Sequence, residues 1–218
     1  MALLTEQDAA AVKEQFDEAL SQPIKLVMFT QEFECSYCRE TREILEELAG
    51  LSSLITVEVY DFVEDKELAD QYGVDKIPAV LALGTGEDGD IDFGIRFFGI
   101  PSGYEFVSLL EAIKLVGGGD VELSQATLDK LATLEEPLHL QVFVTPTCPY
   151  CPRAVVLAHQ LAFASPKVTA DMVEATEFPH LSNKYNVMGV PRTIVNEDTH
   201  IEGAVPEPML MARLPIGD

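Results

Sequence analysis

Apolar residues recur along the chain with two different periods, and together they predict alternating helices and strands. Near the N-terminus Val12, Phe16 and Leu20 recur every four residues, which predicts an amphipathic helix that Pro23 ends. The segments that follow are either rich in β-branched residues or carry an apolar stripe with helical spacing. In chain order we expect a strand at 24–30, a helix at 39–49, a strand at 55–62, a short helix at 66–72, strands at 78–83 and 91–99, and a helix at 104–116.

The second half of the sequence repeats this order of elements. We expect a helix at 124–134, a strand at 138–144, a helix at 154–164, a strand at 168–173, a short helix at 179–185, a strand at 192–196 and a shortened return at 203–214. Three consecutive glycines at 117–119 form a flexible boundary between the halves. We therefore predict two tandem domains, 1–117 and 118–218. Each is a mixed α/β unit with a central mixed sheet flanked by helices.

Each half also carries a Cys-x-x-Cys motif between its first core strand and the helix that follows. The two motifs read Cys35-Ser36-Tyr37-Cys38 and Cys148-Pro149-Tyr150-Cys151. They start 113 positions apart (148 − 35), and the same offset relates Ile77-Pro78 to Val190-Pro191. An internal repeat that keeps the cysteines and a distant proline in register indicates a duplicated redox unit.

The position of each motif at the start of a helix suits thiol chemistry. A thiol attacks a disulfide as the thiolate, and the free N–H groups and dipole at a helix N-terminus favour that charge. Residues three apart share one helix face, so the second cysteine can attack within the molecule. We expect Cys35 and Cys148 to be the nucleophiles and Cys38 and Cys151 to resolve the mixed disulfides, so that each pair closes and opens reversibly.

A proline lies 43 residues beyond the first cysteine of each motif (78 − 35 and 191 − 148). Pro78 and Pro191 each begin a predicted strand after a short helix, which makes them candidates for cis peptide bonds. A cis bond would leave the backbone of Ile77 or Val190 free to pair with an extended substrate. The alternative is an ordinary proline at the start of a strand. The repetition of the proline at the same spacing in both halves disfavours this alternative.

These residues give the chain a resemblance to a known family. Each half resembles a thioredoxin fold, and the tandem is similar to the glutaredoxin-like protein disulfide oxidoreductases known mainly from thermophilic archaea and bacteria. The second motif matches that family, whereas Ser36 stands where its first motif commonly has Gln. The resemblance implies reduction, oxidation or isomerisation of protein disulfides, with electrons from a thioredoxin-reductase-like flavoprotein. The change at Ser36 affects only the tuning of the first site.

The surroundings of the two motifs differ in charge. Carboxylates outnumber cations around the first motif, at Glu32, Glu34, Glu40 and Glu43 against Arg39 and Arg42. Between residues 136 and 164 the only formal charge is Arg153. Carboxylates disfavour a thiolate and a cation favours it, so we expect Cys148 to be the more reactive nucleophile. Tyr37 and Tyr150 are expected at exposed rims, where they either contact substrate or only pack.

Composition narrows the remaining possibilities. The formal net charge of −23 disfavours nucleic acid and anionic membranes as partners. No secretion signal or membrane segment is visible, so we expect a cytoplasmic protein in which the cysteines are catalytic. The 109 residues between Cys38 and Cys148 disfavour a shared zinc ion, and no bound cofactor is expected.

Two alternatives to a general disulfide oxidoreductase stay open. One is an electron relay to a peroxiredoxin-type peroxidase, and the other is a binding module or holdase that works without turnover. Dependence on glutathione is also open. No Gly-Gly pair followed by a polar helix cap comes after Pro191, which favours a flavoprotein or an NADPH-linked donor.

Overall fold

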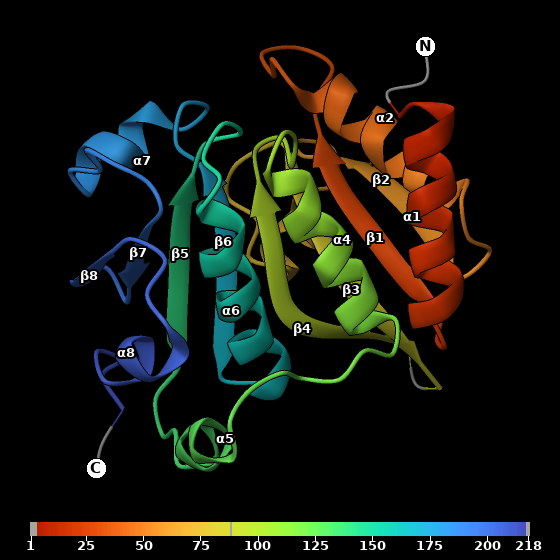
Figure 1. Cartoon of the computed structure of the whole chain (residues 1–218). Helices are drawn as coiled ribbons and strands as arrows, with labels where there is room; N and C mark the ends of the chain where they lie inside the picture. Colours follow the sequence, from red (N-terminus) through yellow and green to blue (C-terminus); the bar gives the residue numbers. More distant parts are fainter. Residues whose placement is uncertain (1–3, 88, 217–218) are drawn as a thin grey trace.

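One mixed sheet of eight strands runs through the computed structural model, which describes residues 4–87 and 89–216 (Figure 1). The strand order is β2-β1-β3-β4-β6-β5-β7-β8. The first four strands belong to the first repeat and the last four to the second. Residues 1–3, 88 and 217–218, which fall inside the two predicted domains, lie outside the described part of the chain.

The first repeat contains the elements that its hydrophobic pattern predicts, with ends shifted by a few residues. They are α1 (Glu6–Ala19), β1 (Ile24–Thr30), α2 (Cys38–Ala49), β2 (Ile55–Asp61), α3 (Lys66–Gln71), β3 (Ala79–Gly86), β4 (Gly89–Phe98) and α4 (Glu105–Val116). The side-chain oxygen of Thr5 accepts the backbone N–H of Asp8 and caps α1, which explains why the helix begins there.

The second repeat adds one strand that the sequence pattern does not reveal. Its elements are α5 (Gln125–Ala132), β5 (Leu138–Val144), α6 (Cys151–Ala164), β6 (Val168–Glu174), α7 (Pro179–Lys184), β7 (Arg192–Val195), β8 (Thr199–Glu202) and α8 (Glu207–Met211). The unexpected strand is β8, which has four residues and one buried side chain. The turn before it places Asn196 and Glu197 at positive φ without a glycine, so the usual hairpin signal is absent.

Strand directions place both cysteine motifs at one edge of the sheet. In each repeat the first core strand pairs in parallel with the second strand of that repeat and antiparallel with the strand after the proline. The repeats join through parallel pairing of β4 with β6. As a result β1 and β5 run in the same direction, as their arrowheads in Figure 1 show. The loops that follow them, which carry the two motifs, therefore emerge at the same edge.

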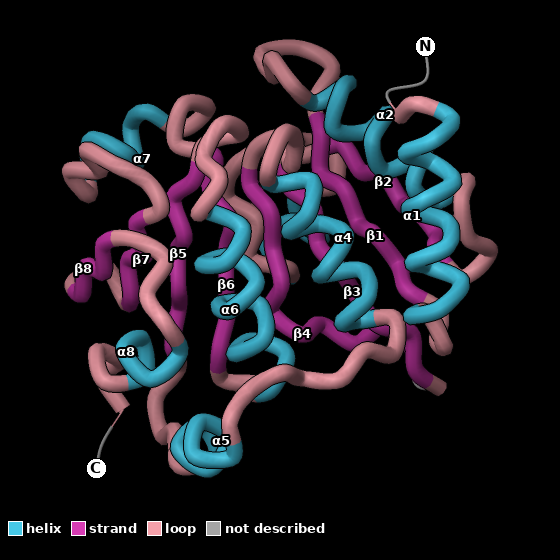
Figure 2. The backbone as a smooth tube through the Cα atoms, in the orientation of Figure 1, coloured by secondary structure: helices cyan, strands magenta, loops and turns pink. Residues whose placement is uncertain are grey.

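Helices cover the two faces of the sheet unequally. Helices α1, α2, α4 and α6 pack against one face, where they share an apolar cluster with alternate residues of the strands (Figure 2). The shorter helices α3 and α7 cover the other face through a smaller cluster. In β1, for example, Leu26 and Met28 face the first cluster, while Val27 and Phe29 face the second.

The three glycines follow α4 and lead into the segment that connects the repeats. Gly117 accepts the backbone N–H groups of Ser21 and Gln22, and Gly118 has a φ of +117°. The boundary between 117 and 118 stays a prediction, and the sheet continues across the two repeats. Among the described residues, none of the helices has the length and hydrophobicity needed to cross a bilayer.

Candidate active site

Both Cys-x-x-Cys motifs are closed as disulfides. Cys35 is bonded to Cys38 and Cys148 to Cys151, with Cα atoms 5.5 Å apart in each pair. The second cysteine of each motif is the first residue of α2 or α6. Cys38 and Cys151 are buried, with 3% and 0% of their surface exposed. They lie deeper than their partners, an arrangement that suits resolving cysteines.

The first cysteines differ in their access to solvent. Cys35 is half-buried, whereas Cys148 has only 8% of its surface exposed. The residues at the N-cap positions, Tyr37 and Tyr150, make no side-chain hydrogen bond to the helices that follow. No side chain at these positions competes with sulfur for the N–H groups of the first turn.

The two prolines lie at the same edge of the sheet as the disulfides. The Ile77–Pro78 and Val190–Pro191 bonds are both cis, as the repeated spacing predicts. Pro78 directly precedes Ala79, which pairs with Phe29 near the end of β1. Pro191 in the same way precedes Arg192, the residue that pairs with Phe143 in β5.

Ile77 and Val190 are half-buried and pack against the apolar clusters on both faces of the sheet. The half-buried Cys35 packs against the first of these clusters as well. The substrate-binding roles of Ile77, Pro78, Val190 and Pro191 stay predictions.

Exposed apolar side chains surround this edge of the sheet. Tyr37 and Tyr150, which the sequence places at exposed rims, have 44% and 65% of their surface exposed. Sequence reasoning missed three further members: Phe33 at 71%, Tyr104 at 50% and Met188 at 85%. Phe33 and Met188 could have been found as apolar residues in the loops before Cys35 and before Val190-Pro191. Tyr104 is distant in sequence from the motif that it approaches. We call these five residues the apolar rim.

Charges around the two motifs are arranged differently. Arg39 lies 3.0 Å from Glu40 and 3.9 Å from Glu43. The cation next to the first motif is therefore already paired with carboxylates. The hydrogen bond with Glu40 raises the pKa of Arg39, and the pKa of Glu40 is lowered by a backbone hydrogen bond and by Arg39. Near the second motif Arg153 is exposed and forms no ion pair within the described residues. The second site therefore has a cation that is free to act on a thiolate.

Four carboxyl groups also lie at this edge, two in each repeat. Glu105 begins α4 with 1% of its surface exposed, and burial raises its pKa to about 7. Burial likewise raises the pKa of Glu177 to about 7, and its Oε1 accepts the N–H of Ile100 at 2.6 Å. Asp61 and Glu174 match across the repeat and both accept backbone N–H groups in the turns that follow their strands. These contacts give Asp61 and Glu174 a structural role.

Comparisons with known proteins agree with this arrangement. A family model described as a thioredoxin domain matches residues 138–214. The solved protein disulfide oxidoreductase of Aeropyrum pernix is 27% identical, with a TM-score of 0.87 over 95% of this chain and 90% of that one. The two repeats are tandem thioredoxin folds, and the chain is similar to the tandem thioredoxin-fold disulfide oxidoreductases. Each repeat carries one Cys-x-x-Cys disulfide, the kind of group that takes part in dithiol–disulfide exchange.

Two further relatives are components of alkyl hydroperoxide reductases. The solved alkylhydroperoxide reductase component AhpF of Enterococcus faecalis is 27% identical, with a TM-score of 0.87 over 97% of this chain and 99% of the solved chain. The corresponding alkyl hydroperoxide reductase component of Staphylococcus epidermidis is 32% identical over 157 residues, which are 72% of this chain and 27% of that protein. The chain thus spans less than a third of the length of this curated relative.

No metal site accompanies the disulfides in the described part of the chain, because no group of three or more His, Cys, Asp or Glu side chains is placed to hold an ion. The four cysteines are all used in the two disulfides.

Proposed function

We propose that this protein is a thiol–disulfide oxidoreductase, which reduces disulfide bonds of protein substrates and receives its electrons from a thioredoxin-reductase-like flavoprotein. The observation that carries the proposal is the placement of both Cys-x-x-Cys disulfides at one edge of the sheet, within the apolar rim. Exposed apolar side chains around a reactive group favour contact with another protein over a small polar substrate.

The reaction runs in two exchange steps. In the reduced protein the thiolate of Cys35 or Cys148 attacks one sulfur of the substrate disulfide, which forms a mixed disulfide and releases one substrate thiolate. Cys38 or Cys151 then attacks the mixed disulfide and releases the second substrate thiol. The substrate gains two electrons and two protons, and the motif is left as the disulfide that the structure shows. The flavoprotein donor returns two electrons to open it again.

Substrate binding is assigned to the backbone of Ile77 and Val190, which precede the cis prolines. An extended substrate segment would pair with this backbone as an added strand. Tyr37 and Tyr150 would contact the side chains of the segment. A reducing compartment such as the cytoplasm suits cysteines that cycle in this way.

A second candidate function is an electron relay to a peroxiredoxin-type peroxidase. The similarity to the two alkyl hydroperoxide reductase components favours it. In this case the disulfide of the peroxidase is the substrate, and the exchange steps are unchanged. The two functions differ in the preferred acceptor.

The test is a coupled assay with the full chain, a thioredoxin-reductase-like flavoprotein and NADPH. Oxidation of NADPH is followed with insulin as a general protein disulfide, and in parallel with a peroxiredoxin and a hydroperoxide. A general reductase turns over insulin at a rate comparable to the peroxiredoxin, whereas a dedicated relay prefers the peroxiredoxin by about 100-fold or more in kcat/KM.

A variant with all four cysteines replaced by serine is the control. It must lose both activities. Should the variant suppress aggregation of an unfolded protein as well as the parent does, while neither protein oxidises NADPH, the chain is a holdase and the proposal is wrong.

A further inference from the structure

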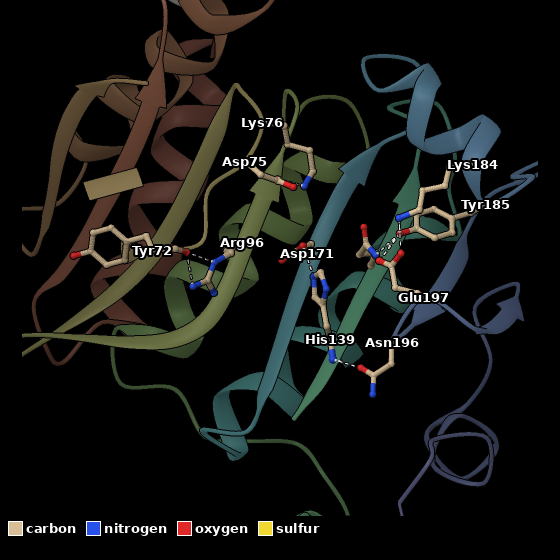
Figure 3. Close-up of polar contacts among 11 residues, drawn as sticks. Tyr72, Asp75, Lys76, Arg96, His139, Asp171, Lys184, Tyr185, Asn196 and Glu197 are labelled. Carbon is tan, nitrogen blue, oxygen red and sulfur yellow. Dashed lines mark hydrogen bonds and ion pairs between the residues drawn. The ribbon is translucent and has the colours of Figure 1, made fainter. Parts of the chain in front are cut away.

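A polar cleft of about 430 Å³ lies on the face of the sheet opposite α2 and α6. It is bounded by residues 72–76, which follow α3, and by α7, and it is floored by β4, β5 and β6, so both repeats contribute to it (Figure 3). Apart from His139, its charged lining residues are three acids and three bases, Asp75, Asp171, Glu197, Lys76, Arg96 and Lys184. Its volume falls within the range of small-molecule sites.

Two buried charges occupy the floor of this cleft, at paired positions on neighbouring strands. Arg96 in β4 is the register partner of Asp171 in β6. Their side chains share a face with Phe98 and Val173, which belong to the smaller apolar cluster. Arg96 has 8% and Asp171 3% of its surface exposed. The seam between the two repeats thus carries a buried cation beside a buried anion.

Each of these groups keeps one polar atom without a partner. Arg96 donates from Nε and Nη2 to the carbonyl of Tyr72 at 3.1 and 2.9 Å, and from Nη2 to Asp92 at 2.7 Å. Its Nη1 has no hydrogen-bond partner. Asp171 Oδ2 lies 2.6 Å from His139 Nε2, whereas Oδ1 has no partner. Buried polar atoms of this kind are nearly always paired, so the lining of the cleft holds a donor and an acceptor that still lack a partner.

Arg96 and Asp171 do not satisfy each other, since the ion pairs formed by the described residues do not include one between them. Their other partners hold both side chains in place. Arg96 is fixed by Tyr72 and Asp92, and Asp171 by His139. A molecule that satisfies both free atoms must carry an anionic or acceptor group and a cationic or donor group within a short distance.

We propose that this cleft binds a small zwitterion, an α-amino acid or a short peptide with free ends. Its carboxylate accepts from Arg96 Nη1, and its ammonium group donates to Asp171 Oδ1. The balance of charges in the lining favours a ligand without net charge. A polyanion is repelled by the acids of the cleft and by the net charge of −23, and a simple cation faces three basic side chains.

The experiment is a titration of the full oxidised chain, followed by ¹H–¹⁵N NMR and calorimetry. The probes are the common amino acids, alanyl-alanine and trialanine, each compared with its N-acetylated and its C-amidated form. We expect at least one free zwitterion to bind with shifts centred on the amides of Arg96 and Asp171. Blocking either end should weaken binding by about tenfold or more. The amino-acid and peptide arms tell which of the two classes fits the cleft.

Variants test the two contacts separately. Arg96→Lys, which keeps the charge but removes the planar fork, and Asp171→Asn should each weaken binding by about tenfold or more. Asp129→Asn, at an exposed acid in α5 outside the cleft, should change it by less than about threefold. Where a variant does not fold, the blocked ligands give the same test on the parent protein.

Three results would overturn the proposal. The first is that none of the probes binds at concentrations up to about 10 mM, which would mean that only water fills the cleft. The second is that blocked and free ligands bind equally. The third is that the shifts centre on the cysteine motifs, which would show that the ligand binds at the redox site and not in the cleft.

Discussion

The backbone N–H of Tyr104 donates a 2.9 Å hydrogen bond to the carbonyl oxygen of Pro146. Tyr104 precedes α4 in the first repeat, and Pro146 lies two residues before Cys148 in the second. The bond therefore ties a loop of the first repeat to the loop that presents the second motif. The position of Cys148 depends on both repeats, even though each motif has its own strand and helix.

Gly103 makes this contact possible, and Gly103→Ala tests it. Gly103 has a φ of +60°, and an added Cβ would meet the carbonyl oxygen of Pro146. We expect the variant to lose about 1–3 kcal/mol of unfolding free energy, measured with denaturant. Alkylation of the reduced protein should slow at Cys148 more than at Cys35. The matched control is Gly73→Ala, which has a similar φ of +67° with open space around it.

The two glycines separate backbone strain from the contact with Pro146. Both variants carry the cost of alanine at positive φ, but only Gly103→Ala displaces the loop before Cys148. Equal losses of stability with unchanged alkylation at Cys148 would show that the Tyr104–Pro146 contact does not position the second motif.

Glu105 makes the stability depend on pH in the neutral range. Burial raises its pKa from 4.5 to about 7, against a hydrogen bond from Ser108 Oγ at 2.6 Å that lowers it. Between these two pH values the folded protein binds more protons than the unfolded one, so its stability falls as pH rises. The shift corresponds to about 3 kcal/mol. We expect Glu105→Gln to stabilise the protein by up to this amount at pH 8 and hardly at pH 5, as measured by denaturant unfolding.

Glu67→Gln provides the comparison for Glu105→Gln. Glu67 is an exposed acid in the first turn of α3, as Glu105 is a buried one in the first turn of α4. Its replacement should change stability by less than about 0.5 kcal/mol at both pH values. A gain for Glu105→Gln that is the same at pH 5 and pH 8 would show that its charge is not the cause.

The order of helices and strands could be predicted from the sequence because it depends on local patterns. The spacing of Val12 and Phe16, the β-branched run at 24–30 and the repeated cysteines each act within a few residues. The cis bonds before Pro78 and Pro191 could be predicted because both copies have the same spacing between the first cysteine and the proline. In a single copy, the same proline could equally be an ordinary residue at a strand start. A repeated sequence thus supplies its own control.

The contacts between the repeats could not be predicted in this way. Pairing of β4 with β6 depends on two strand edges that are distant in sequence, and no local pattern specifies which edges meet. Arg96 lies between Ile95 and Phe97, which are both buried. This position indicates a buried charge, but the sequence pattern alone does not say what the charge contacts. Asp171 could not be recognised as its neighbour without the register of the two strands.

His159 makes the protein sensitive to acid. Its side chain has 2% of its surface exposed, contacts Phe97 with ring centroids 4.9 Å apart, and burial lowers its pKa from 6.5 to about 4. The unfolded protein binds more protons between these pH values, so stability is lost as pH falls through this window. The shift corresponds to about 3 kcal/mol. We expect His159→Leu to flatten this acid limb in denaturant unfolding between pH 7 and pH 4.

A replacement at the exposed His180 is the control for His159→Leu. His180→Leu should leave the loss of stability between pH 7 and pH 4 as it is in the parent protein. An acid limb that remains equally steep in His159→Leu would assign the sensitivity to other groups.

The first cysteines of the two motifs should differ in reactivity. Solvent access to the sulfur favours Cys35, whereas the nearby charges favour a thiolate at Cys148. Cys35 is more exposed than Cys148, but Arg39 beside it is paired with Glu40, whereas Arg153 is free to favour a thiolate at Cys148. We expect charge to decide at low salt, so that Cys148→Ser lowers reductase activity about tenfold more than Cys35→Ser.

Two arginine variants test the electrostatic cause. Arg153→Gln should slow alkylation of Cys148 in the reduced protein, and added salt should reduce this effect. Arg39→Gln should change the alkylation of Cys35 little. If instead Cys35→Ser abolishes activity and Cys148→Ser keeps most of it, access to the sulfur outweighs its electrostatic surroundings, and Cys35 is the principal nucleophile.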